Sequence, residues 1–204
     1  MFWNDVTYLN RGSERQRDAF RVLIELDLFS VLAEFEPMLA GDFPLGLETP
    51  QSDLVILCNA ESLERFTEVV SVVYSDQDEF LICDIEENGL LTLLCTFRRQ
   101  GIVVALSAQA CPTEEQDAYR HLVAEARLLR EGGEEAVLAI RDLKLEGMKT
   151  ESAFGSYFCL LDDPAQALLA LADVSADELS EVVIQAKIAR RNLPMRLSTI
   201  LAPS

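Results

Sequence analysis

Hydroxyl and carboxylate side chains flank a turn and the start of an apolar strand near the beginning of the chain. Gly41 and Asp42 form a glycine-bearing turn, and Ser52 and Asp53 open the apolar run Leu54–Leu57. This order places a carboxylate at the start of a buried strand, beside a flexible turn. The arrangement suits either a working phosphate and metal site or only the frame of one.

Further candidates lie in the second half of the chain, on segments expected to be helical. His121 is the single histidine, so any His-based triad or multi-histidine metal site must include it. Arg120 and Arg127 share one helix face and can both point into a cleft. Lys149 follows Gly147 at a helix start, where backbone amides and a lysine can meet an anion. The structural alternatives are a histidine ordered by its own helix, a solvated arginine face and simple helix capping.

The composition describes a folded acidic protein. The chain has 204 residues, 50% of them hydrophobic, and a formal net charge of −18. Such a field disfavours general nucleic-acid binding and anionic membranes, and no apolar run is long enough for a membrane helix. A nucleotide carried by a divalent cation, another small molecule or a basic protein remains an acceptable partner.

Cysteine usage and the N-terminal segment both bear on location. The five cysteines are widely spaced and form no C-x-x-C pair, so we expect ordinary buried thiols of a reducing compartment. The N-terminus lacks the basic start and apolar centre of a signal peptide. Both features predict a cytoplasmic protein.

Periodicity predicts an α+β fold with its strands in the first half. A capping box formed by Ser13 and Gln16 opens a helix over residues 13–27, and Asn59 is expected to cap a second helix over residues 61–74. A further short helix is expected over residues 29–34. The expected strands cover residues 38–40, 54–58, 79–85, 90–97 and 102–107. Short turns between the last three favour antiparallel hairpins, and their apolar character predicts helices packed on the sheet.

From Pro112 onward the pattern is helical. Thr113 and Gln116 are expected to form a capping box, Gly132 and Gly133 to end that helix, and Asp163 with Pro164 to start a later one. We predict an α/β part over residues 1–112 and a helical part over residues 113–204, packed together as one unit. No role is assigned to the tail, residues 172–204.

The run from Leu39 to Cys58 resembles the signature of the nucleotidyltransferase superfamily, in which a glycine and a Ser or Thr precede an Asp-x-Asp pair on the next strand. The wider pattern is similar to one uncharacterised bacterial family of nucleotidyltransferase-like proteins. It covers roughly residues 8–171 and includes these residues: Tyr8, Leu9, Gly12, Arg15, Gln16, Gln116, Tyr119, Arg120, His121 and the segment Gly147–Phe154. The resemblance implies a mixed β-sheet flanked by helices, with a C-terminal helical part.

The same resemblance implies a site that this sequence fills only in part. Substrate binding would fall on these residues: Gly41, Asp42, Ser52, Asp53, Arg120, His121 and Lys149. The metal carboxylates would fall on Asp53, on position 55 and within residues 103–107, but those positions hold Val55 and, at the best match, Ala105. Two-metal chemistry needs two or three carboxylates, so Asp53 is the single metal ligand carried over and no catalytic residue is assigned.

Three hypotheses follow. The first is a nucleotidyltransferase-fold protein that has lost catalysis and acts by binding a ligand or a protein, without a cofactor. The second is an active Mg²⁺-dependent nucleotidyltransferase in which Asp42 and Glu48 join Asp53 in a rearranged carboxylate set. The third is an acidic interaction module that neutralises a basic partner.

Overall fold

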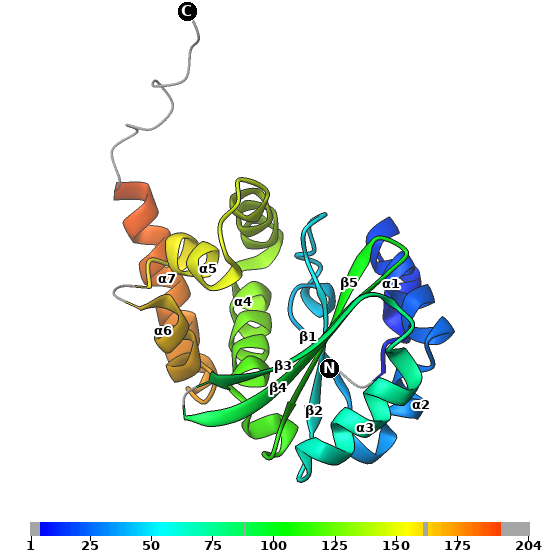
Figure 1. Ribbon diagram of the computed structural model, residues 1–204. Helices are drawn as coiled ribbons and strands as arrows, with labels where there is room; N and C mark the ends of the chain where they lie inside the picture. The colour runs from blue at the N-terminus through cyan, green and yellow to red at the C-terminus, as the bar shows by residue number, and fades with distance from the viewer. Residues whose placement is uncertain (1–4, 88, 161–162, 193–204) are drawn as a thin grey trace, which may run out of the picture. The chain divides into compact units, whose positions relative to one another are not determined.

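The computed structural model describes residues 5–87, 89–160 and 163–192 of the chain (Figure 1). Contacts divide the chain into two compact units, Met1–Ala126 and Arg127–Ser204. The domain boundary that the sequence suggests, between residues 112 and 113, stays a prediction. Within the described ranges, no helix is both long and apolar enough to span a membrane.

The first unit is built on one mixed five-stranded sheet with the order β1-β2-β5-β4-β3. Its strands are β1 (Met38–Ala40), β2 (Leu54–Asn59), β3 (Asp78–Glu87), β4 (Leu90–Arg99) and β5 (Ile102–Gln109). β3, β4 and β5 form the predicted antiparallel hairpins, whereas β2 runs parallel to β5 and antiparallel to β1. The predicted strands and the α+β class are therefore confirmed.

Helices on one side of the sheet enclose the main core. They are α1 (Glu14–Glu25), α2 (Leu28–Val31) and α3 (Leu63–Tyr74), drawn beside the sheet in Figure 1. Leu54, Ile56, Val104 and Leu106 point toward them, because alternate residues of a strand face the same side. Phe66 of α3 belongs to the same buried cluster.

The first turns of α4 (Asp117–Leu145) pack on the opposite face. Leu122 is 1% exposed and contacts the cluster formed by Ala40 and Leu57, with Val55 and Tyr119 packed against it. This second face carries the residues that flank the predicted site.

Local capping signals were confirmed at some helix ends and wrong at others. Ser13 and Gln16 form the predicted capping box of α1. Asn59 instead ends β2 and donates to Glu36 Oε2 at 2.9 Å, while Ser62 caps α3. Gln116 is the C-cap residue of η4, and its side-chain amide donates to the carbonyl oxygen of Cys58 at 3.0 Å instead of completing the predicted capping box.

Short 3₁₀ helices complete the first unit: η1 (Thr7–Arg11), η2 (Ala33–Phe35), η3 (Phe43–Leu45) and η4 (Thr113–Glu115). η4 occupies the place where the capping box of Thr113 and Gln116 was expected. α4 therefore begins only at Asp117.

The second unit is helical, as predicted. It holds the rest of α4, α5 (Thr150–Phe158), α6 (Pro164–Leu171) and α7 (Ala176–Asn192). Gly133 interrupts α4 with φ 73° and ψ −168°, a conformation that a β-carbon disfavours, so the predicted helix break is present. Asp163 caps α6 as expected, and Lys149 is the N-cap residue of α5 without a capping hydrogen bond from its side chain.

Candidate functional site

The predicted site lies at the N-terminal end of β2, on the sheet face against which the first turns of α4 pack. In-register pairing places four side chains from adjacent strands in one row, here called the central row: Ala40, Val55, Ala105 and Thr96. Val55 and Ala105 are direct neighbours on the parallel strands β2 and β5. The sheet thus brings together the two positions at which the resemblance implies metal carboxylates, and neither side chain has a ligand atom.

Gly41 lies next to Val55 of the central row. Its φ is +72°, and a β-carbon built on it would lie 3.5 Å from Val55 Cγ2. The turn after β1 therefore passes close to Val55, in a backbone conformation that glycine favours. The predicted proximity of this turn to the start of β2 is present.

Asp42 and Ser52 are joined to each other. The Ser52 hydroxyl donates to Asp42 Oδ2 and accepts a hydrogen bond from the Thr49 backbone N–H at 2.9 Å. Thr49 and Ser52 are both buried. The Asp42 carboxylate thus helps to close the 41–53 loop, the segment between β1 and β2.

Glu48 is held by the start of α1. It is 1% exposed, and its Oε1 accepts a hydrogen bond of 2.5 Å from the Ser13 hydroxyl. Its Oε2 has no hydrogen-bond partner among the residues that the structure describes. A buried carboxylate oxygen without a donor is costly, which makes the hydrogen bond from Ser13 the important compensation.

The residues that follow Ser13 attach the same loop to α1. Arg15 Nη2 donates to the carbonyl oxygen of Pro50 at 2.9 Å, and Gln16 Nε2 donates to that of Phe43 at 2.7 Å. The guanidinium of Arg15 also lies 5.9 Å from the centre of the Phe43 ring. Residues in the first turn of α1 therefore position the 41–53 loop, a role that the local sequence did not reveal.

Asp53 is exposed at the start of β2. Partial burial raises the pKa of its carboxyl group, Arg98 opposes that rise, and Asp42 adds to it. Arg98 lies two residues beyond Thr96 on β4, so it shares the face of the central row. The guanidinium of Arg98 therefore borders the site. In the sequence, the single hint of this cation is the pair of arginines before the β4–β5 turn.

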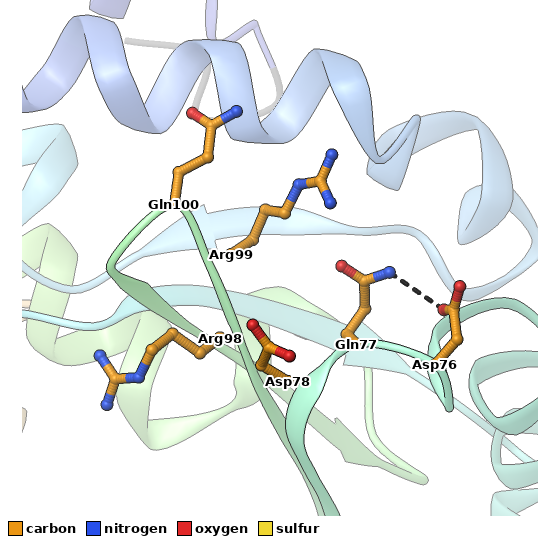
Figure 2. Close-up of a pocket in the computed structure, with 6 residues that line it drawn as sticks. All are labelled: Asp76, Gln77, Asp78, Arg98, Arg99 and Gln100. Carbon is orange, nitrogen blue, oxygen red and sulfur yellow. Dashed lines mark hydrogen bonds between the residues drawn. The ribbon is translucent and has the colours of Figure 1, made fainter.

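Arg98 also lines a cavity of about 330 Å³ with Asp76, Gln77, Asp78, Arg99 and Gln100. Figure 2 shows Arg98 and Arg99 pointing away from each other. Arg98 Nε lies 3.1 Å from Glu79 Oε2, and Arg99 Nη2 lies 3.4 Å from Glu25 Oε2. Both arginines are thus already paired with a carboxylate.

The other predicted site residues are two residues of α4 and the N-cap residue of α5. Arg120 and His121 are partly buried near the start of α4, next to Leu122, which packs on the sheet. Lys149 is exposed and belongs to the second unit. Among the described residues, no group of three or more His, Cys, Asp or Glu side chains is placed to hold a metal ion.

The raised pKa of Asp53 predicts a small pH-dependent penalty. The folded state holds the proton more tightly than the unfolded state, so ionised Asp53 destabilises the fold at neutral pH and not at acidic pH. Asp53→Asn should raise the Tm by about 1 °C at neutral pH, and the gain should shrink as the pH falls and vanish below the ordinary aspartate pKa of 3.8. Differential scanning calorimetry measures it, with Glu14→Gln, an exposed acid on α1, as control. A gain that persists at acidic pH would contradict this origin.

One solved polymerase structure has a similar fold, and two others align with lower scores. A Cid1 poly(U) polymerase with Mg 3'-dATP bound aligns with a TM-score of 0.51 and 10% identity, over 79% of this chain and 50% of that one. The MgGTP-bound form of Cid1 aligns with a TM-score of 0.47 and 11% identity, over 67% of this chain and 44% of that one. The polymerase core of TRAMP, an RNA surveillance complex, aligns with a TM-score of 0.44 and 14% identity, over 89% and 59% of the two chains.

The first of these alignments establishes the fold alone, which is nucleotidyltransferase-like. The chain spans about half the length of that polymerase, or 50%. No curated protein sequence matches the chain. The family described as Domain of unknown function (DUF4269) matches residues 21–171, which is most of the chain, and the protein therefore belongs to that family.

Proposed function

We propose that this protein keeps the nucleotidyltransferase fold without its catalysis and acts by binding a ligand or a protein partner. The observation that carries the proposal is the pairing of Val55 with Ala105 in the central row. Nucleotidyl transfer of the usual kind needs carboxylates on adjacent strands to hold two metal ions and to stabilise the in-line displacement. Methyl groups at both positions leave Asp53 as the single carboxylate of the implied set.

The hydrogen bonds of the neighbouring acids argue against a rearranged metal site. Asp42 accepts from Ser52, and Glu48 is buried against Ser13. Each of these hydrogen bonds occupies one oxygen of its carboxylate, and among the described residues no three acids are grouped to hold a metal ion. The active, Mg²⁺-dependent alternative therefore requires Asp42 or Glu48 to move toward Asp53, and we assign the protein no cofactor.

The charge of the chain supports a basic partner. A net charge of −18 attracts basic segments and repels phosphate backbones. All five cysteines are free thiols, which fits the cytoplasmic location that we propose. A nucleotide or another small molecule at Gly41, Asp42, Ser52 and Asp53 is the second kind of ligand that the frame admits.

Isothermal titration calorimetry with magnesium and each nucleoside triphosphate tests the proposal. We expect no metal-dependent binding at nucleotide concentrations up to about 1 mM. A dissociation constant of about 1 mM corresponds to a binding free energy of only about −4 kcal/mol, so even weak binding would be detected. Asp53→Ala should behave like the native chain, and Glu14→Ala serves as the matched loss of an exposed acid. Tight binding that requires magnesium and is lost in Asp53→Ala would overturn the proposal.

A further inference from the structure

Strand β3 forms an open edge of the sheet. Its hydrogen-bonded neighbour is β4, and it is the last strand in the order β1-β2-β5-β4-β3. Leu81, in the middle of this strand, is 56% exposed. A long edge strand offers unpaired backbone groups to another extended chain, which proteins either block or use for recognition.

A largely apolar groove lies between the start of α3 and the β3–β4 hairpin and reaches β3 at Asp84. This hairpin groove has a volume of about 470 Å³ and is lined by Leu63 of α3 and by Leu91 and Leu93 of β4, among others. Leu93 is 4% exposed whereas Leu91 is 57% exposed, so the apolar surface continues outward from the core. α3 begins at Leu63, and this first residue of the helix lines the groove.

Carboxylates surround the apolar floor. Glu61 and Glu64, at the start of α3, and Asp84 of β3 line the same groove. Asp84 pairs with Leu93 and Glu86 pairs with Leu91 across the hairpin. Paired residues share a face of the sheet, so both acids lie on the face that carries the groove. No described lysine or arginine forms an ion pair with any of these four acids.

The carboxylates beside the groove favour a basic partner over a second copy of this chain. A second copy of the chain, added edge to edge, would bring Asp84 and Glu86 close to the same acids of the other copy, and like charges on adjacent strands repel. A strand whose lysine or arginine residues alternate with apolar residues would meet carboxylates on one face and still complete the backbone hydrogen bonds.

We infer that an extended basic segment of a partner protein adds to the edge of β3 and places its cationic side chains in the hairpin groove. The inference rests on the proposed binding function and specifies the chemistry of its partner. Contacts with Leu91 and the edge backbone supply affinity, whereas Glu61, Asp84 and Glu86 supply the preference for positive charge.

A fluorescent peptide of alternating valine and lysine probes the groove by anisotropy with the full chain at low salt. We expect a dissociation constant of roughly tens of micromolar, and a weakening of about tenfold in E61Q/D84N. The matched variant E14Q/D27N removes the same two side-chain charges from exposed positions in and beside α1 and should change the affinity less than about twofold. A valine–glutamate peptide should not bind.

Hydrogen exchange locates the bound peptide. Amides of residues 83–86 should exchange more slowly with the peptide present, and a peptide N-methylated on alternate residues should lose both binding and protection. The inference is overturned if E14Q/D27N weakens binding as much as E61Q/D84N, if the N-methylated peptide binds normally, or if the native chain dimerises through β3. Absence of peptide binding removes only this inference, since the loss of catalysis is tested separately with nucleotides.

Discussion

Introducing aspartate at both neighbouring positions, in V55D/A105D, is expected to give the protein a divalent-metal site with a dissociation constant of roughly tens of micromolar. Neighbouring strands lie about 4.8 Å apart, so carboxylates on paired residues can share one ion. Asp53 stands at the start of the same strand as Val55 and supplies the third carboxylate. Titration calorimetry with Mn²⁺ measures the gain, against millimolar or weaker binding by the native chain.

The control for this gain is V55N/A105N, which adds side chains of the same size without the charge. Both variants introduce polar groups where Val55 is partly buried and Ala105 is 7% exposed, so both should lose stability. Mn²⁺ should raise the Tm of the aspartate variant alone, because the ion binds the folded state. Equal Mn²⁺ binding by both variants, or by neither, would show that the central row is not the metal position of the fold.

Removing the guanidinium of Arg127 should cost the second unit about 2–4 kcal/mol of unfolding free energy. Arg127 Nη1 donates to the carbonyl oxygens of Leu171 at 3.1 Å and of Ala172 at 2.7 Å, and Nη2 donates to that of Val174. These carbonyls belong to the last residue of α6, to its C-cap and to the segment just after it, where the helix leaves its acceptors without internal donors. One charged side chain therefore caps α6 and ties it to α4.

Urea unfolding of Arg127→Ala, followed by far-UV circular dichroism, measures this loss. Arg127→Lys should recover less than half of it, because an ammonium group cannot reproduce the planar fork of donors. Arg130→Ala removes an arginine three residues later whose ion pair with Glu131 is largely exposed, and it should cost less than about 0.5 kcal/mol. If Arg127→Ala and Arg130→Ala are equally stable, the three carbonyl contacts contribute nothing beyond a surface charge.

Features encoded by neighbouring residues were predictable. The capping box of Ser13 and Gln16, the cap formed by Asp163 and the break at Gly133 each depend on a few consecutive residues, and all are present. Predictions failed where a distant partner took the side chain. Asn59 and Gln116 both have the residue type of a helix start, but tertiary hydrogen bonds to Glu36 and to the Cys58 carbonyl engage them instead.

The candidate site shows the same division. The turn at Gly41 and the start of β2 were located from the sequence, because glycine, serine and aspartate at these places have local conformational roles. The engagement of Glu48 by Ser13 joins residues 35 positions apart. The proximity of Arg98 to Asp53 depends on the parallel pairing of β2 with β5, which no turn in the sequence encodes.

Transfer of label from α-³²P nucleoside triphosphates is the most direct measurement of whether catalysis is lost. The native chain, incubated with each nucleotide and with Mg²⁺ or Mn²⁺, should transfer no more label to itself, to RNA or to small acceptors than Asp53→Ala does. That result follows from a central row in which Val55 and Ala105 provide no ligand for a second metal ion. Transfer by the native chain that disappears in Asp53→Ala would contradict the account.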